Sequence, residues 1–216
     1  MLNLNLNLKG RGRPHLLFLG AHCDDIEIGC GGTILEWLER YPRAAVDWVV
    51  LSSDRQREAE ARKAARRFLG KRPARITVKQ FRNSFFPSEA AAIKEFFEEL
   101  KRGVSPDVVF THYGQDLHQD HRVVSELTWN TFRNHLVLEY EIPKFDGGLG
   151  SPNVFVPVTA ATLRRKVRIL MDVFGTQRSK TWFTPSTFEG LMRLRGVECN
   201  APDGYAEAFY GRKIVV

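Results

Sequence analysis

The chain has 216 residues, of which 43% are hydrophobic and 26% charged, and its formal net charge is +7 at pH 7. This length predicts one domain whose core is large enough to be stable without disulfides. Its three cysteines match no disulfide framework or zinc-ribbon spacing, which indicates reduced thiols and a cytoplasmic protein. No apolar run reaches the roughly 18 residues of a membrane span. Residues 1–14, a low-complexity Leu-Asn tail, lack the apolar stretch of a signal peptide.

The basic residues group on two predicted helices, at 54–72 and at 164–168, rather than in one compact block. On the first helix the acidic residues Glu58 and Glu60 are interleaved with the arginines. Such mixing favours an ordinary solvated helix face. The alternative is a site for an anionic partner such as phosphate, acidic lipid or nucleic acid.

Apolar runs alternate with helical patterns along the first 135 residues. The runs predict buried strands at 15–21, 46–53, 74–80 and 106–112. Between and after them the patterns predict a glycine-rich loop leading into a helix over 29–40, and helices at 54–69, 88–102 and 119–134. After these elements, a Gly-rich turn at 146–151 separates the segments VLEYEIP and NVFVPV. A helix is expected over 159–174. The chain then ends with AEAFYG and a last short strand.

This rhythm predicts an α/β fold, a Rossmann-like three-layer α/β/α arrangement with a mostly parallel sheet. Residues 15–216 contain no internal repeat or linker, so we expect them to form a single domain. In open parallel sheets the ligand site lies beyond the carboxyl ends of the strands. The polar residues that follow the predicted strands are therefore the candidates for function.

Two of these strand ends carry the densest groups of His and Asp in the chain. The first strand runs into AHCDDIEIGCGGT at 21–33, and the strand at 106–112 runs into THYGQDLHQDH at 111–121. Four of the six histidines lie in these two segments. Charged residues crowded at the end of a buried strand are costly unless they serve a purpose.

The spacing within both segments suits a metal site. His22 and Asp25 are three residues apart, as are His118 and His121, so each pair can face one point in a turn or at a helix start. Imidazole and carboxylate ligands suit Zn²⁺, and a catalytic zinc keeps three protein ligands and an open position for water. Asp24 would point elsewhere and could act as a base toward that water. A capping turn is the plainer interpretation of either segment alone, but the two together favour a metal.

The motifs resemble those of the PIG-L/LmbE family of zinc-dependent de-N-acetylases. AHCDDIEIGCGGT is similar to the family's AHPDD(E/I)-x-x-GCGGT, and HQDH is similar to its HPDH or HxDH. Supporting matches extend the resemblance over roughly residues 15–212; they are the R-x-x-E that starts at Arg57, the Ala-Ala and Leu-Gly pairs of the same helix, Lys166, Gln177 and the YAEAF that starts at Tyr205.

The resemblance implies a role for each residue of the two segments. The implied ligands of zinc, or of another divalent transition metal, are His22, Asp25 and His121. Asp24 would be the general base, and protonated His118 would stabilise the oxyanion or protonate the leaving amine. Asp120 would orient one of the histidines.

The sequence departs from the family pattern at four positions, none of them an expected ligand. Cys23 stands where the family has proline, and Ile26 stands where it often has glutamate. Thr176 replaces the serine of a Ser-Gln pair, and Asn83 lies where an aspartate is frequent. We expect Cys23 to be structural or incidental.

For the substrate, the resemblance implies an N-acetylated amino sugar, such as an N-acetylglucosamine glycoside or a glycolipid or glycan precursor. We expect Arg57 and Tyr113 to contact it, although an ion pair with Glu60 is as plausible for Arg57. Segment 142–157 is a lid, an oligomer contact or a plain hairpin connection. Aromatic residues near the loops would stack on sugar rings or pack as core or lid; they are Phe85, Phe86, Tyr113, Trp182, Phe183 and Phe188.

Three other interpretations stay open from the residues alone. The first is a zinc amidohydrolase acting on a non-sugar acetamide, since the metal chemistry is indifferent to the carrier of the acyl group. The second is a basic module that binds anions or nucleic acid, which leaves both motifs unexplained, so we do not expect a nucleic-acid partner. The third, a degenerate metal-free member, is disfavoured because all the expected ligands are present. Peripheral contact with a membrane and homo-oligomer formation are left open.

Overall fold

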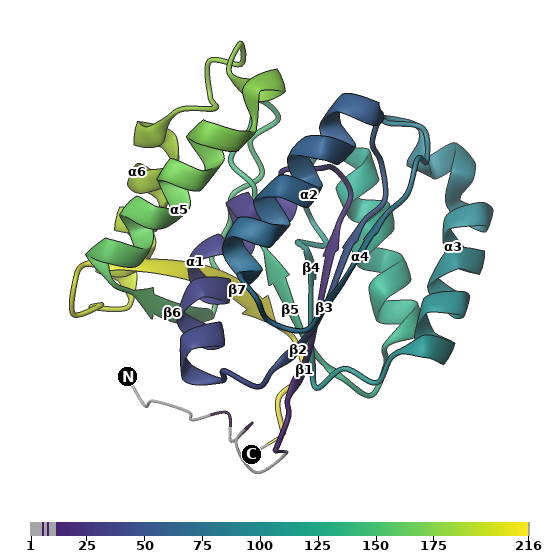
Figure 1. The fold of residues 1–216 in the computed structure, drawn as a ribbon, viewed down its shortest axis with the longest axis horizontal. Helices are drawn as coiled ribbons and strands as arrows, with labels where there is room; N and C mark the ends of the chain where they lie inside the picture. The colour runs from purple at the N-terminus through teal and green to yellow at the C-terminus, as the bar shows by residue number, and fades with distance from the viewer. Residues whose placement is uncertain (1–5, 7, 9–11, 216) are drawn as a thin grey trace.

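The computed structural model describes residues 6, 8 and 12–215, and within them one seven-stranded sheet forms the centre of the molecule. The order of its strands is β3-β2-β1-β4-β5-β7-β6 (Figure 1). The strands are β1 (His15–Gly20), β2 (Ala45–Val50), β3 (Ala74–Val78), β4 (Val108–His112), β5 (Leu136–Tyr140), β6 (Val154–Val158) and β7 (Tyr205–Gly211).

Strands β1 to β5 run parallel to one another, and β7 pairs antiparallel with both β5 and β6. The last strand of the chain is thus placed inside the sheet and not at its edge. The mostly parallel sheet confirms the predicted α/β class. The carboxyl ends of β1, β2 and β4 meet at the upper edge in Figure 1, where the sequence places its polar motifs.

Helices cover both faces of the sheet and complete three layers (Figure 1). The helices α3 (Phe86–Gly103) and α4 (Gln119–Thr131) lie on one face. The other face carries α1 (Asp25–Arg40), α2 (Arg55–Leu69), α5 (Ala160–Val173), the short 3-10 helix η2 (Gly175–Gln177) and α6 (Pro185–Glu198).

Alternation along the central strands divides the apolar side chains between two cores. In β1, Leu16 and Phe18 belong to the core beneath α1, α2 and α5, whereas Leu17 and Leu19 belong to the core beneath α3 and α4. All four are fully buried. Full burial of such side chains contributes about 2 kcal/mol each, so this strand is held from both sides.

The glycines of the first motif lie inside α1 rather than in the glycine-rich loop that we expected to lead into the helix. The helix begins at Asp25, and close neighbours explain the missing side chains. A Cβ at Gly29 would lie 2.2 Å from Cδ2 of Tyr140, and one at Gly32 would lie 3.0 Å from Oε1 of Glu207. These glycines therefore allow Tyr140 and Glu207 to pack closely against α1, and they do not interrupt the helix.

Other element boundaries also differ from the expectations. Helix α3 begins at Phe86, so Ser88 is within it and does not cap it. Helix α6 was not predicted, although Pro185 opens it and the Thr184 hydroxyl accepts a hydrogen bond from the backbone N–H of Thr187. Residues 212–215, all described, lie in no strand, in contrast with the last short strand we expected.

Most of the predicted tail over residues 1–14 lies outside the described residues. Two of its described residues pack on the domain: Leu8 is 9% exposed and belongs to the larger core, and the Leu6 carbonyl accepts a hydrogen bond from the Tyr41 hydroxyl. Leu6 and Leu8 therefore contact the domain, and the division at residue 15 stays a prediction.

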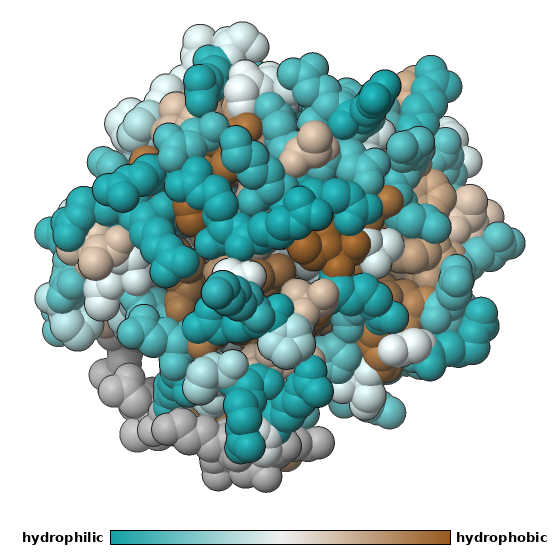
Figure 2. All heavy atoms as spheres, in the orientation of Figure 1, coloured by the Kyte–Doolittle hydropathy of each residue, from teal (hydrophilic) through white to brown (hydrophobic). Residues whose placement is uncertain are grey.

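The two basic helices are neighbours on the outside of the molecule, where hydrophilic residues predominate (Figure 2). Arg62 pairs with Glu58 within α2, and Arg67 of α2 pairs with Asp172 of α5. Across the part of the chain that the structure describes, we find no helix with the length and apolar character needed to cross a bilayer.

Candidate metal and catalytic site

The two sequence motifs meet at the carboxyl edge of the sheet. The turn after β1 carries His22 and Asp24, and Asp25 opens α1. From the neighbouring β4, the chain brings His118 to the N-cap of α4 and His121 to its first turn. Strands β1 and β4 pair directly, which is why segments about 100 residues apart come together.

The three side chains expected to bind a metal lie next to one another. His22 Nδ1 lies 3.2 Å from His121 Nε2 and 3.3 Å from Asp25 Oδ2, and His121 Nε2 lies 3.6 Å from Asp25 Oδ1. Two donors that each lie about 2.1 Å from a tetrahedral ion are about 3.4 Å apart. His22 and His121 approach different oxygens of Asp25, and two sets of three residues have single donor atoms that all lie within 4.8 Å of one another: His22, His118 and His121, and Asp25, His112 and His121. His121 belongs to both sets, so either could hold a divalent metal together with it.

Each of the two histidines has a carboxylate at its other ring nitrogen. His22 Nε2 lies 3.2 Å from Asp120 Oδ2, and His121 Nδ1 lies 3.0 Å from Asp116 Oδ2. Such carboxylates fix the tautomer and orientation of a ligating imidazole. Asp120 thus orients His22, as the sequence suggested for one of the histidines, whereas Asp116 was not assigned this part.

Backbone groups hold Asp120 in turn. The N–H groups of Ser84 and Phe86 donate hydrogen bonds to its two oxygens, at 2.7 and 3.2 Å. Ser84 has a φ of 66°, a conformation uncommon for a residue other than glycine. The loop before α3 is therefore shaped to present its N–H groups to this carboxylate.

Asp24, the expected general base, is buried beside the three donors and is held by Arg57. A guanidinium nitrogen of Arg57 donates to Asp24 Oδ1 at 3.0 Å. Burial and the neighbouring Asp25 raise the pKa of Asp24, while Arg57 opposes this rise. The alternative partner for Arg57, Glu60, instead accepts hydrogen bonds from Thr176.

His118 is half-buried and has a defined tautomer. Its Nδ1 accepts a hydrogen bond from the backbone N–H of Asp120 at 3.2 Å, so the neutral ring carries its proton on Nε2. Burial lowers the pKa of His118, and the charge of His22 lowers it further. These surroundings favour neutral imidazole, in contrast with the protonated ring that we expected from the sequence.

The site concentrates opposite charges. Burial alone would lower the pKa of His22, but Asp25, Asp120 and Asp24 outweigh it and raise the pKa to about 9. Burial and His112 lower the pKa of His121 to about 3. Burial acts to raise the pKa of Asp25, but the surrounding histidines hold it well below its ordinary range. The surrounding carboxylates therefore favour the protonated form of His22.

A fourth histidine, His112, lies against the same carboxylate. Its Nε2 is 3.2 Å from Asp25 Oδ2, accepts a hydrogen bond from the backbone N–H of Ala21, and lies 3.2 Å from the Tyr140 hydroxyl. His112 is one of the four clustered histidines, but the sequence motifs give it no role. Its position at the carboxyl end of a buried strand was the available signal.

Tyr113 and Cys23 do not point toward the donors. The ring of Tyr113 stacks on Tyr210 at a centroid distance of 3.8 Å, and its hydroxyl donates to Gln115. The Cys23 thiol donates to the Ser52 carbonyl at 3.3 Å. The structure thus gives Cys23 a contact with the backbone after β2.

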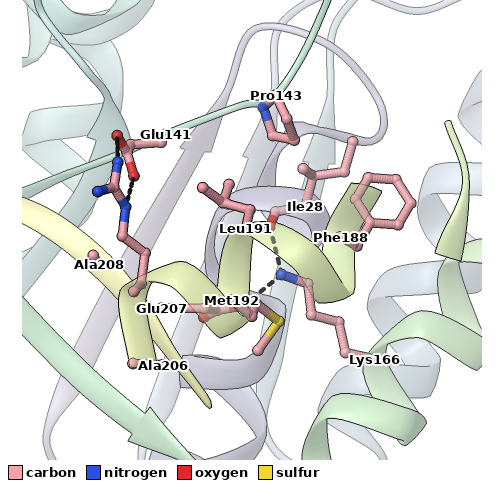
Figure 3. A pocket seen from close by; sticks show the side chains of 12 residues that line it. Ile28, Glu141, Pro143, Lys166, Phe188, Leu191, Met192, Ala206, Glu207 and Ala208 are labelled. Atoms are coloured by element: carbon pink, nitrogen blue, oxygen red, sulfur yellow. Dashed lines mark hydrogen bonds and ion pairs between the residues drawn. The ribbon is translucent and has the colours of Figure 1, made fainter. Parts of the chain in front are cut away.

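A buried ion pair supports the helix that carries Asp25. Lys166 donates to the carbonyl of Ile28 and to Glu207, both at 2.6 Å (Figure 3). The two oxygens of Glu207 accept from the backbone N–H groups of Gly32 and Thr33 at 2.7 Å. Strand β7 and α5 are thus joined to the middle of α1 through charged hydrogen bonds.

Beside this ion pair is a cavity of about 20 Å³, room for about one water. Glu141, which follows β5, lies across it from Lys166 (Figure 3), and it pairs with Arg195 of α6. The cavity is too small for a sugar and belongs to the supporting structure.

Comparison with known proteins identifies a family and a shared fold. A sequence model of the family described as "PIG-L: GlcNAc-PI de-N-acetylase" matches residues 17–132. The fold is similar to N,N'-diacetylchitobiose deacetylase from Pyrococcus horikoshii, at 18% identity and a TM-score of 0.67, over 96% of this chain and 87% of that one.

Two further solved structures share the fold. The A40926 pseudoaglycone deacetylase Dbv21 is 17% identical, with a TM-score of 0.67, over 94% of this chain and 99% of that one. The 4-carboxy-2-hydroxymuconate hydratase GalB from Pseudomonas putida is 15% identical, with a TM-score of 0.68, over 94% and 98%. Because a hydratase shares the fold, the fold alone does not decide the reaction.

Proposed function

We propose that this chain, which belongs to the PIG-L (GlcNAc-PI de-N-acetylase) family, is a metal-dependent hydrolase that removes the N-acetyl group from an amino sugar. One observation carries the proposal: the histidines and aspartate of the two motifs lie within hydrogen-bonding distance of one another and form two possible sets of three metal donors, which share His121. Two imidazoles and one carboxylate suit Zn²⁺, and three ligands leave a fourth position open.

The residues around that position have separate roles in amide hydrolysis. A bound zinc would polarise the acetyl carbonyl and lower the pKa of water. Asp24, held by Arg57, accepts the proton from the attacking water as the C–O bond forms. His118 donates its Nε2–H to the developing oxyanion. The proton on Asp24 then passes to the amine nitrogen as the C–N bond breaks, which yields acetate and the free amino sugar.

The sugar part of the proposal is supported by the family and by its relatives. The matching family model is described by a glucosamine-containing substrate, and one protein with the same fold is a deacetylase of N,N'-diacetylchitobiose. We therefore place the N-acetylglucosamine-type glycosides first among the substrates. Contact of Arg57 or Tyr113 with the sugar stays a prediction, with Arg57 already engaged by Asp24.

The test is acetate release from a panel of acetamides by the zinc-loaded protein. The panel holds free N-acetylglucosamine, its O- and thioglycosides, and non-sugar acetamides. We expect acetate and free amine from sugar members only, loss of turnover after chelation, and recovery on adding zinc. Acetate from non-sugar acetamides alone would favour the broader amidohydrolase, and no acetate from any member with zinc bound would overturn the proposal.

A further inference from the structure

A buried carboxylate in β5 is bound by the segment of chain that follows β7. Glu139 lies opposite Thr111 of β4 and opposite Tyr210 of β7, and it is 1% exposed. Arg212, directly after β7, donates from Nε to Glu139 Oε1 at 2.7 Å. A buried charge is costly unless it is paired and hydrogen-bonded. Arg212 therefore stabilises the charge of Glu139 within the sheet.

Two further elements donate to the same carboxylate. The indole Nε1–H of Trp129 in α4 donates to Glu139 Oε1 at 2.5 Å, and the backbone N–H of Gly114 donates to Oε2 at 2.7 Å. The guanidinium carbon of Arg212 lies 4.2 Å from the centroid of the Trp129 ring, a cation–π contact. One oxygen of Glu139 thus binds α4 and the chain after β7, while the other binds the loop after β4.

The loop approaches this ion pair closely at Gly114. A Cβ on Gly114 would lie 3.1 Å from a guanidinium nitrogen of Arg212, and 3.4 Å from both Glu139 Oε2 and Ser125 Oγ. A contact of 3.1 Å is tighter than a Cβ ordinarily makes, so a side chain here would push the loop away from Glu139. The absence of a side chain at Gly114 therefore suits the hydrogen bond that its N–H makes.

The same loop carries the carboxylate that orients two histidines of the site. The backbone N–H of Asp116 donates to the Tyr113 carbonyl at 3.1 Å, which closes a β-turn with Gly114 inside it. Asp116 Oδ1 accepts the backbone N–H of His118 at 2.7 Å, and Oδ2 lies 3.0 Å from His121 Nδ1. A displacement of the turn at Gly114 would therefore move Asp116 relative to both histidines.

We propose that Glu139 and Arg212 are positioning residues of the candidate metal site. They hold the turn at 113–116, and the turn places the Asp116 carboxylate against the histidines. The effect on turnover rests on the proposed function, whereas the effects on the turn and on metal affinity do not. A purely structural ion pair is the alternative. It is disfavoured because one oxygen of Glu139 binds the turn itself.

The first variant, Glu139→Gln, keeps the size of the side chain but turns one acceptor into a donor. The amide oxygen should stay with Trp129 and Arg212, so the amide nitrogen faces the N–H of Gly114 and that hydrogen bond is lost. Hydrogen exchange followed by mass spectrometry should then be about tenfold faster over 113–118. Zinc affinity, measured by competition with a chromophoric chelator, should fall about tenfold. For the methyl glycoside of N-acetylglucosamine, kcat should fall with little change in KM.

The second pair of variants changes the cation. Arg212→Met should cause the same changes to a smaller extent, and Arg212→Lys, which keeps a cation beside Glu139, should restore most of the zinc affinity. Lys213→Met is the matched control. The ammonium of Lys213 lies 5.2 Å from the centroid of the same Trp129 ring but donates to the carbonyl of Arg133. Its replacement should leave hydrogen exchange, zinc affinity and kcat unchanged.

The outcomes separate this inference from the proposed function. Wild-type exchange over 113–118 in Glu139→Gln would overturn the inference. Faster exchange without a loss of zinc affinity would also overturn it, because the turn would then move without affecting the site. A lower free energy of unfolding in urea, with exchange and affinity unchanged, would identify a purely structural ion pair. If the wild type releases no acetate, the deacetylase fails, and exchange and zinc affinity still judge Glu139 and Arg212.

Discussion

The ammonium group of Lys144 lies 2.7 Å from Asp116 Oδ2, the same oxygen that lies 3.0 Å from Nδ1 of His121. Asp116 Oδ1 also accepts the backbone N–H of His118 at 2.7 Å. One carboxylate thus orients two histidines of the site, and a lysine from the loop after β5 holds that carboxylate in place. His121, an expected metal ligand, is therefore supported by a residue on the loop after β5.

Replacing this lysine should weaken metal binding. Lys144→Met removes one donor to Asp116, so we expect zinc affinity to fall about tenfold, whereas Lys144→Arg should retain most of it. Competition with a chromophoric chelator measures the affinity. Lys94→Met, which breaks an ion pair with Glu98 on the exposed side of α3, is the matched control and should leave zinc affinity unchanged. Equal affinities for Lys144→Met and wild type would contradict this role.

Removing the base should stop turnover without removing the metal. Asp24→Asn keeps the shape of the side chain but cannot accept the proton, so we expect kcat to fall about a thousandfold. Zinc content, measured by atomic absorption after dialysis, should stay near that of the wild type. Asp172→Asn, which alters an exposed ion pair with Arg67, should keep full activity. A kcat within a few-fold of wild type would exclude Asp24 as the base.

The buried Lys166–Glu207 pair lends itself to a double-mutant cycle. Lys166→Met or Glu207→Gln alone leaves a buried charge without its partner, and we expect each to lower the free energy of unfolding by about 3–5 kcal/mol. The double variant should be less destabilised than the sum of the two single ones. Urea denaturation measures all three, and strictly additive losses would show that the pair is not coupled.

The glycines of α1 should differ sharply from a glycine on an open helix face. Gly29→Ala places a Cβ against the ring of Tyr140, and we expect it to lower the free energy of unfolding by about 3 kcal/mol. At Gly190 in α6 a Cβ meets no atom within 4 Å. Gly190→Ala should therefore raise the free energy of unfolding by about 0.5–1 kcal/mol. Thermal unfolding followed by circular dichroism compares the two, and a stable Gly29→Ala protein would contradict the packing.

A carboxylate far from the site should give a pH-dependent contribution to stability. Burial acts to raise the pKa of Asp47, but hydrogen bonds with His15 and Arg75 outweigh it and lower the pKa. This contribution is complete above the unfolded pKa of about 3.9 and is lost as the pH falls through the lower folded value. Asp47→Asn should cost about 1–2 kcal/mol at pH 7.

The difference between wild type and Asp47→Asn should then narrow as the pH is lowered from about 5 to about 3. Urea denaturation over this range measures it. A gap that is constant or that widens on acidification would show that the charge of Asp47 is not what stabilises the sheet at this point.

How far the sequence could predict the fold depended on whether the information was local. Strands β1, β2 and β4 were predicted because each is a continuous apolar run, and α2 because Asp54 and Gly70 mark its ends. The start of α1 was wrong because the reasons for its glycines, Tyr140 and Glu207, lie more than 100 residues away in the chain. Helix α6 was missed because its apolar residues form only a weak amphipathic pattern.

The same distinction between local and non-local information applies to the residues of the candidate site. His22, Asp25 and His121 stand in short motifs with a recognisable spacing, and the structure brings their donor atoms together. His112 and Asp116 lie in the same segments, but their hydrogen-bonding partners are determined by how β4 packs against β1 and β5. Lys144 lies in a loop with no recognisable motif, so its ion pair with Asp116 could be found only in the folded structure.

The placement of β7 has a consequence for the order in which the molecule is assembled. All the residues expected to hold the metal lie before residue 122, whereas Glu207, which holds the middle of α1, arrives on a strand that must insert between β5 and β6. Contacts of such long sequence separation form late, because the intervening chain must be ordered first. We therefore expect metal affinity to appear in the final phase of refolding, after most of the helical signal has returned.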